Sequence, residues 1–400
     1  MNNESPWTVT VNRESALGGE NGQRATVLVT GGAGYVGSVL VQKLLKLGFR
    51  VRVLDNFLYR SPGSVTVDRS PCTDNGKRAT DNGLTIIPGD FRELDKVLTG
   101  LNGVNACIHL GAIVGDSACA LSPKLTIETN LIATRQIAQL AKALGVKRFI
   151  FASTCSVYGA GNGDFALSED EPFTSLKPLS LYAETKIAAE KYLLTMRDKN
   201  FQPVILRFAT IYGLSYRPRF DLVVNLLTAK AITERKITVF GGKQWRPFIS
   251  VVDICSALIK ALLAPEELVS GQIFNVGSND QNYQIEEIAE TIKELLPSTQ
   301  IQKEDTISDA RNYFVKFDKI KTLLGFTPSY QIKDGIKEII RAFEDKKIQD
   351  YRAPQYNNYL ALKLLEAVRG LPQAVIFDCL DGGKSEINQE LKTVASIRQG

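Results

Sequence analysis

The sequence predicts an α/β protein built on a doubly wound parallel sheet, with a smaller C-terminal lobe. A glycine-rich turn joins an apolar strand to an amphipathic helix at 25–47. The strand that follows ends in an acidic residue, and strand and helix patterns then alternate along the first half of the chain. Such alternation is typical of a parallel sheet with helices on both faces.

The glycine-rich turn, Thr30 to Gly37, reads T-G-G-A-G-Y-V-G. It follows the short β-branched run 25–29 and precedes apolar residues at helical spacing, which end at Gly48. Two spacings fit a dinucleotide turn: Gly31, Gly34 and Gly37 as G-x-x-G-x-x-G, and Gly32, Gly34 and Gly37 as G-x-G-x-x-G. Glycines let a diphosphate approach the backbone, where the N–H groups of the helix start face it.

The next strand, 50–54, ends at Asp55, which lies 18 residues (55 − 37) beyond the last glycine of the turn. A carboxylate at this point is placed to bind both hydroxyls of an adenosine ribose. The same carboxylate repels a 2′-phosphate. The sequence therefore favours NAD over NADP as the cofactor.

The remaining elements follow from periodicity. Strands are expected at 84–87, 104–110, 148–152, 204–208, 237–240 and 272–276, and helices at 131–144, 180–196 and 359–368. The polar stretch 61–83 is expected to be a loop insertion. The expected organisation is a disordered tail (1–24), a dinucleotide-binding domain (25–208, with part of 235–265 returning to it), a smaller lobe (mainly 209–345) and an extension (346–400).

Composition narrows the functional classes. The 400-residue chain has a net charge of +5, and its basic residues are mixed with acids, so we expect neither a nucleic-acid nor a membrane partner. The N-terminal residues lack an apolar segment, which favours the cytoplasm. The six cysteines form no C-x-x-C pair, and His109 is the single histidine, so no metal site is expected. We expect His109 to be a packed residue at a strand end.

A candidate catalytic pair lies on the helix expected at 180–196. Tyr182 and Lys186 are four residues apart and therefore share one face of that helix. A free phenol has a pKa of about 10, and a nearby ammonium favours its ionised form. Tyr182 is thus a candidate base for a sugar hydroxyl. Thr154, at the end of the strand 148–152, is placed to hold the same oxygen.

Taken together, the motifs resemble an extended short-chain dehydrogenase/reductase of the NAD-dependent epimerase/dehydratase family, which carries a Rossmann domain and acts on nucleotide sugars. The resemblance covers about residues 25–340. It rests on T-G-G-A-G-Y-V-G, Asp55-Asn56, G-D-F at 89–91, H-L-G-A at 109–112, Asn130, S-T-C-S-V-Y-G at 153–159, Y-A-E-T-K at 182–186, L-R-F at 206–208, W-R-P-F-I-S-V-V-D at 245–253 and F-N-V-G at 274–277.

The resemblance implies a role for each matching residue. The cofactor-binding set is Gly31, Gly34, Tyr35, Val36, Gly37, Asp55, Asn56, Asp90, Phe91, Leu110, Gly111, Ala112, Asn130, Tyr182 and Lys186, and the catalytic set is Thr154, Tyr182 and Lys186. The set expected to bind a nucleotide-diphosphate sugar in the smaller lobe's cleft is Asp116, Thr154, Asn225, Arg246 and Arg311. The resemblance also implies a homodimer formed through the helices at 131–144 and 180–196.

The residues after Thr154 bear on the reaction. Dehydratases of this family carry a carboxylic acid there, and its 3,5-epimerases carry a cysteine two residues before the tyrosine of V-Y-G. This chain has Cys155 and Ser156 at the acid positions, with Ser156 at the cysteine position. We therefore expect an epimerase that oxidises C4 transiently and returns the hydride. A 4-keto-sugar reductase, a dehydratase and a non-catalytic NAD-binding scaffold stay as alternatives.

Overall fold

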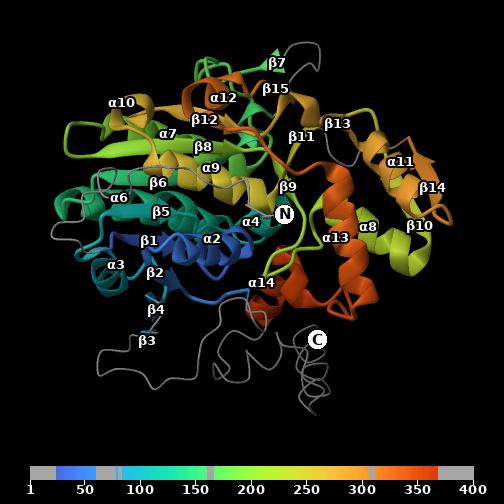
Figure 1. The fold of residues 1–400 in the computed structure, drawn as a ribbon, viewed down its shortest axis with the longest axis horizontal. Helices are drawn as coiled ribbons and strands as arrows, with labels where there is room; N and C mark the ends of the chain where they lie inside the picture. Colours follow the sequence, from blue (N-terminus) through green and yellow to red (C-terminus); the bar gives the residue numbers. More distant parts are fainter. Residues whose placement is uncertain (1–23, 60–77, 80–82, 160–165, 306–310, 368–400) are drawn as a thin grey trace, which may run out of the picture.

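A computed structural model describes residues 24–59, 78–79, 83–159, 166–305 and 311–367. Its centre is an eight-stranded sheet of seven parallel strands and one antiparallel edge strand (Figure 1). In spatial order the strands are β12 (Ile273–Val276), β8 (Gln202–Phe208), β6 (Arg148–Thr154), β5 (Ala106–His109), β1 (Thr26–Thr30), β2 (Arg50–Asp55), β4 (Leu84–Pro88) and β3 (Arg78–Ala79). The predicted fold class is confirmed.

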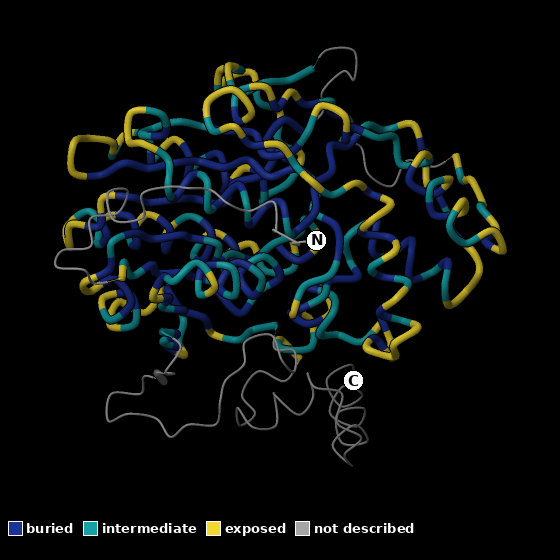
Figure 2. Tube along the Cα trace, viewed as in Figure 1, coloured by how far each residue is buried: buried dark blue, intermediate teal, exposed yellow. Residues whose placement is uncertain are grey.

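Helices cover both faces of this sheet, as the alternation of side chains along β1 requires. Val27 and Val29 point to the face covered by α2 (Tyr35–Lys46) and α9 (Val251–Leu263). Leu28 points to the other face, covered by α3 (Leu94–Leu101), α6 (Ala133–Ala143) and α7 (Leu181–Thr195). The side chains between the sheet and the helices are buried on both faces (Figure 2). The helix expected at 131–144 begins earlier, with a π-helical turn at Glu128–Ile132.

The smaller lobe packs three helices against a two-stranded parallel sheet. The helices are α8 (Val223–Glu234), α11 (Ile285–Leu295) and α13 (Ile332–Glu344), and the strands are β10 (Lys236–Phe240) and β14 (Gln300–Glu304). A mixed sheet of β9 (Thr210–Tyr212), β11 (Trp245–Ser250) and β13 (Asn282–Gln284) connects the two lobes. The strand expected at 272–276 is β12, which extends the large sheet beside β8.

The extension beyond the smaller lobe returns to the large one. Its helix α14 (Asn358–Ala367) packs against α4 (Asp116–Leu121), and Leu362 is buried with Ile113, Ala118 and Cys119. The remaining short elements are α5 (Pro123–Ile127), α10 (Glu266–Val269), α12 (Asp318–Leu324), β7 (Ala166–Leu167), β15 (Phe314–Val315) and three 3₁₀ turns at Cys155–Tyr158, Asn279–Gln281 and Pro354–Tyr356.

Two sequence expectations fall mainly outside the described residues. The tail predicted at 1–24 is described only at Arg24. Of the loop insertion predicted at 61–83, the structure describes 78–79 and 83. Within that stretch the pair 78–79 forms β3, antiparallel to β4, so a short edge strand interrupts the expected loop.

Candidate functional site

The glycine-rich turn between β1 and α2 forms a cradle that excludes side chains. Gly31 has φ +70°, and its N–H donates to the Leu54 carbonyl (2.9 Å), which ties the turn to the end of β2. A Cβ on Gly37 would lie 2.2 Å from the Gly31 carbonyl oxygen. The helix therefore begins directly on the turn, and its first N–H groups face the pocket. This cradle fits a diphosphate bound to backbone.

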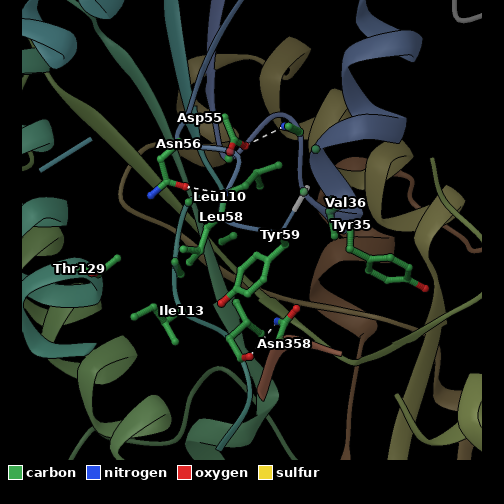
Figure 3. Close-up of a pocket in the computed structure, with 18 of the residues that line it drawn as sticks. Tyr35, Val36, Asp55, Asn56, Leu58, Tyr59, Leu110, Ile113, Thr129 and Asn358 are labelled. Atoms are coloured by element: carbon green, nitrogen blue, oxygen red, sulfur yellow. Dashed lines mark hydrogen bonds between the residues drawn. The ribbon is translucent and has the colours of Figure 1, made fainter. Parts of the chain in front are cut away.

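Asp55 lies at the end of β2, against the turn (Figure 3). Its carboxylate accepts hydrogen bonds from the N–H groups of Ala33 (2.9 Å) and Phe57 (2.7 Å). Burial raises the pKa of Asp55, while these two bonds oppose the rise. Asn56 donates to Asp90 (3.3 Å), which links the two acidic strand ends. These groups fit the adenosine end of a dinucleotide.

One pocket brings together most of the predicted cofactor residues. Those that line it are Gly31, Gly34, Tyr35, Val36, Gly37, Asp55, Asn56, Asp90, Phe91, Leu110, Gly111, Ala112, Tyr182 and Lys186. The predicted residues that are not among its lining are Asn130, Thr154, Asp116, Asn225, Arg246 and Arg311. The pocket therefore brings together 14 of the 15 residues predicted to bind the cofactor, including the candidate catalytic pair Tyr182 and Lys186, and its lining does not include the residues predicted to bind the sugar nucleotide.

Tyr35 contributes differently from the prediction. Its hydroxyl donates to the carbonyl of Gly213 (2.6 Å), in the loop after β9. Figure 3 shows its ring directed away from the pocket centre. The backbone at the start of α2 faces the pocket, while the side chain ties that helix to the smaller lobe. Burial raises the pKa of this phenol.

The candidate catalytic pair lines the pocket, with Lys186 buried and Tyr182 partly buried. The Lys186 ammonium donates to the Ala152 carbonyl at the end of β6 (2.8 Å) and lies 4.6 Å from the centre of the Phe151 ring. It is 6.0 Å from the centre of the Tyr182 ring. Burial lowers the pKa of Lys186 to about 8. The ammonium is therefore held beside the phenol on one helix face, as the i, i+4 spacing predicts.

The pKa of Tyr182 differs from the prediction in the ligand-free protein. We expected Lys186 to lower it, but burial raises it above the ordinary value. A hydrogen bond with the side chain of Thr154 opposes the rise, as does the charge of Arg219. Desolvation of the phenolate thus outweighs the nearby ammonium.

Three of the residues predicted to bind the sugar nucleotide, Asp116, Arg246 and Arg311, interact with one another. Arg246, on β11, is buried against Tyr313 and donates to the carbonyls of Trp245 (2.8 Å) and Arg311. Arg311 forms an ion pair with Asp116 (3.2 Å). The structure therefore joins Asp116, Arg246 and Arg311 into one charged cluster between the lobes.

The two predicted asparagines hold backbone instead of lining the pocket. Asn130 accepts from the Ile113 N–H (2.8 Å) and donates to its carbonyl (2.9 Å), which fixes the loop after β5. Asn225 bonds both backbone groups of Gly213 and donates to the Arg219 carbonyl (2.8 Å). The structure shows both amides engaged with pocket-lining loops, so their effect on a ligand is indirect.

His109 is packed, as predicted from its apolar segment. Its Nδ1 lies 2.6 Å from the Thr30 hydroxyl, and its Nε2 lies 2.9 Å from the Thr134 hydroxyl. Burial lowers its pKa to about 3, which keeps the ring neutral. This histidine joins β1, β5 and α6 and takes no part in the pocket lining.

Tyr59, Arg217, Arg219 and Asn358 are among the pocket-lining residues that sequence reasoning missed. Tyr59 lies in the loop after β2, Arg217 and Arg219 lie in the loop between β9 and α8, and Asn358 begins α14. They come from loops and an extension that carry no periodic pattern. The one sequence pattern that could have pointed to them is R-P-R at 217–219, whose two arginines are buried in the structure.

Within the described ranges, no group of three or more metal-ligating side chains is assembled. No described helix combines the length and the apolar character needed to cross a bilayer.

Comparison with known proteins places this geometry in a family. Residues 27–277 match the model of the NAD dependent epimerase/dehydratase family. The chain is 30% identical, over 330 residues, to a UDP-N-acetyl-alpha-D-glucosaminuronate decarboxylase of Bacillus cytotoxicus, a match that covers 80% of this chain and 97% of the relative. An uncharacterised UDP-glucose epimerase of Bacillus subtilis is also 30% identical, with 78% of this chain and 95% of the relative covered.

A solved structure of a nucleotide-sugar enzyme is similar to this chain over most of its length. The UDP-glucuronic acid 4-epimerase of Bacillus cereus, in complex with UDP-glucuronic acid and NAD, matches with a TM-score of 0.68 and 25% identity over 80% of this chain and 99% of that one. The epimerase/dehydratase model covers more than half of the chain, and the B. cytotoxicus decarboxylase is 30% identical over 80% of it. The chain therefore belongs to the NAD dependent epimerase/dehydratase family of nucleotide-sugar enzymes.

Proposed function

We propose that this enzyme is an NAD-dependent nucleotide-sugar epimerase that acts by transient oxidation at C4 and return of the hydride. The observation that carries the proposal is the Tyr182–Lys186 pair, which shares one pocket with the glycine turn and Asp55. NAD, when bound, supplies the acceptor and donor of the hydride. Asp55 favours NAD because its carboxylate repels a 2′-phosphate.

The chain's own residues supply proton transfer and orientation. Tyr182 takes the proton of the C4 hydroxyl and gives it back, and Thr154, which hydrogen-bonds Tyr182, orients the same oxygen. Lys186, held by the Ala152 carbonyl, stabilises the phenolate. Arg246 and Arg311 hold the diphosphate of the sugar nucleotide, because a guanidinium pairs with phosphate in a fork.

The environment of Cys155 and Ser156 argues against elimination of water. Cys155 is buried, its thiol donates to the Arg207 carbonyl (3.3 Å), and burial raises its pKa well above the usual range. Ser156 lies beside Arg311. The nearby carboxylate, Glu190, is engaged by Arg207 (2.7 Å). No described side chain after Thr154 offers the carboxylic acid that a dehydratase carries at these positions.

Decarboxylation is a second candidate, because the B. cytotoxicus relative is a decarboxylase of a nucleotide-linked uronic acid. It begins with the same C4 oxidation, since a 4-keto uronic acid is a β-keto acid and loses carbon dioxide readily. The residues described above serve both outcomes. The nature of the C6 group on the substrate then decides between them.

The test is incubation of the NAD-loaded enzyme with UDP-glucose, UDP-N-acetylglucosamine and their uronic acids in deuterium oxide. The proposal expects a C4 epimer of unchanged mass, no deuterium at C5 and no net consumption of NADH. A pentose product with carbon dioxide release identifies a decarboxylase, and deuterium at C5 with loss of water identifies a dehydratase. A parallel reaction with added NADH and a 4-keto sugar nucleotide identifies a reductase by net oxidation of NADH. If none of these sugar nucleotides is converted and none exchanges hydrogen with the bound NAD, the proposal is overturned and a non-catalytic NAD-binding scaffold is favoured.

We also propose a homodimer formed through α6 and α7. These helices pack together, and Arg135 on α6 lies 4.5 Å from the ring centre of Tyr192 on α7. Ile132, just before α6, is 53% exposed. An apolar side chain left open on this face fits burial against a second copy. Light scattering of Ile132→Asp beside the wild type tests it, and an unchanged monomer mass in both overturns it.

A further inference from the structure

Three residues with buried polar atoms line the pocket without a part in the chemistry proposed above. Tyr59, Arg217 and Asn358 come from the loop after β2, the loop between β9 and α8, and the first residue of α14. We call them the three-segment cluster. Tyr59 Oη, Arg217 Nε and Nη2, and Asn358 Oδ1 are buried and have no hydrogen-bond partner among the described residues. Figure 3 shows Tyr59 and Asn358 among the pocket-lining side chains.

Arg217 carries a buried charge that forms no close ion pair among the described residues. It is 1% exposed, and its guanidinium lies 4.7 Å from the centre of the Tyr59 ring. Its neighbour Arg219 is neutralised by Asp221 through two hydrogen bonds of 2.9 Å. Asp221 also accepts from the Asn358 N–H (3.1 Å). A buried cation without a close counter-ion destabilises a fold, whereas a bound anion removes that cost.

The cluster offers free hydrogen-bond donors on Arg217 and a free acceptor on Asn358, and together they indicate the chemistry of the ligand. Arg217 offers two free N–H donors, which suit a phosphate oxygen. The Asn358 amide donates to the Val114 carbonyl (3.0 Å), so its free Oδ1 is an acceptor and suits a sugar hydroxyl. The Tyr59 hydroxyl serves either partner. A phosphate next to a hydroxyl-bearing ribose satisfies all three residues.

The position of the cluster selects the cofactor over the sugar nucleotide. Arg217 interacts electrostatically with Asp55, at the adenosine end of the pocket. Tyr59 packs in the same apolar cluster as Tyr182, at the catalytic end. The cluster thus lies along the path between the two ends, where the diphosphate of a dinucleotide runs. The arginines expected to hold the sugar nucleotide, Arg246 and Arg311, lie outside this pocket's lining.

We propose that Tyr59, Arg217 and Asn358 form a second half of the cofactor's diphosphate–ribose site, opposite the glycine turn. This proposal rests on the proposed NAD-dependent function. The cofactor is then gripped by the large lobe, by a loop leading into the smaller lobe and by the C-terminal extension. Such a grip retains the cofactor between turnovers, as an enzyme that returns the hydride to its own substrate requires.

The test measures binding, without reference to turnover. Calorimetry on cofactor-stripped protein compares NAD, ADP-ribose and adenosine for Arg217→Met, Asn358→Leu and the control Lys363→Met, which changes an exposed charge on α14. Arg217→Met is expected to weaken NAD and ADP-ribose about 10- to 100-fold, the range of a charged hydrogen bond, and to leave adenosine unchanged. Asn358→Leu is expected to weaken both about 2- to 10-fold. Lys363→Met should match the wild type.

Thermal unfolding separates a ligand role from a structural one. Removal of a buried charge without a close ion pair among the described residues should leave the melting temperature of ligand-free Arg217→Met unchanged or higher, and reduce the shift that NAD produces. A lower melting temperature with unchanged NAD and ADP-ribose affinity overturns the proposal. A loss of affinity for UDP-glucose alone also overturns it and assigns Arg217 to the substrate. A wild type that binds NAD but converts no sugar nucleotide contradicts the proposed function and leaves this site standing.

Discussion

At the scale of single residues, burial governs the chemistry of the site more than neighbouring charge does. It lowers the pKa of Lys186 to about 8 and raises that of Tyr182, so that the ligand-free pair is poised against proton transfer. In the proposed mechanism, a cationic nicotinamide beside the ring favours the phenolate and so opposes this effect of burial on the pKa of Tyr182. The proposal therefore couples ionisation of Tyr182 to occupancy of the cofactor site.

Tyr182→Phe tests the role of the phenol. The substitution removes the ionisable oxygen and keeps the ring packed against α4 and α14. General acid–base catalysis contributes about 10² to 10⁴-fold, so kcat should fall by that factor while the affinity for NAD stays near the wild-type value. Difference titration near 295 nm, wild type minus variant, should give a lower pKa for Tyr182 with NAD than without it. An unchanged kcat contradicts the assignment.

Asp55→Ala tests the choice of cofactor. The carboxylate favours the free ribose hydroxyls of NAD and repels the 2′-phosphate of NADP, so its loss should weaken NAD and narrow the ratio of the two dissociation constants. Because the Ala33 and Phe57 N–H groups lose their acceptor, ligand-free stability should be measured alongside. Equal affinities of the wild type for NAD and NADP contradict the role given to Asp55.

His109 predicts a pH dependence of stability. Its folded pKa of about 3 lies below the unfolded value of about 6.5, so the unfolded chain alone gains a proton as pH falls below 6.5. Stability is full above that pH and declines toward pH 3. Between pH 7 and 5 the loss should be about 2 kcal/mol. Urea unfolding of the wild type and His109→Gln at both values measures it, and the variant should lack that part of the decline.

At the scale of elements, local patterns predicted the sheet and the cofactor cradle. The strands β1, β2, β4, β6 and β8 lie within one or two residues of their expected ranges, because each is a short apolar run bounded by turn residues. The Gly31–Gly37 turn and the Tyr182–Lys186 pair were likewise set by spacing alone. The partners of β12, by contrast, depend on long-range pairing that periodicity does not encode.

The same limit explains the residues that were missed. Arg217 and Asn358 reach the pocket through the packing of α14 on α4 and of Asp221 against the start of α14. No local pattern marks them, since each contact joins segments more than 100 residues apart. The sequence placed Asn130 and Asn225 by resemblance to a motif, whereas their hydrogen bonds to Ile113 and Gly213 appear once the loops are folded.

Gly37→Ala tests the cradle. The new methyl carbon would lie 2.2 Å from the Gly31 carbonyl oxygen and 2.6 Å from the Gly32 Cα, so α2 has to move away from the turn. We expect a destabilisation of about 1–3 kcal/mol and a loss of NAD affinity. Gly100→Ala, within α3, is the control: its nearest atoms are 3.4 Å away on Leu28, and helical Ala is favoured over Gly. Equal unfolding midpoints in the two variants contradict the cradle.

At the scale of the whole molecule, the pocket is a junction of three parts of the chain. The glycine turn belongs to the large sheet, Arg217 and Arg219 lie on the loop leading to α8, and Asn358 begins the extension. Contacts already join these parts without a ligand. The Tyr35 hydroxyl on α2 donates to the Gly213 carbonyl (2.6 Å), and the Asn358 N–H donates to Asp221, in the loop before α8 (3.1 Å). The lobes are therefore preorganised, and a ligand in the pocket contacts all three parts at once.

This geometry predicts how hydrogen exchange responds to ligands. A ligand that binds the folded state raises the free energy of opening of every segment it bridges, by about 2.7 kcal/mol at a hundred times its dissociation constant. NAD should therefore slow exchange at 31–37, 213–222 and 356–362 together. Adenosine lacks the diphosphate, so at equal saturation it should protect 55–57, at the adenosine end of the pocket, and leave 213–222 and 356–362 at their ligand-free rates. In Arg217→Met, NAD should lose its protection of those two distal segments first. If NAD protected the glycine turn alone, the prediction would be wrong: the large lobe alone would bind the cofactor, and neither the loop before α8 nor the extension would contribute.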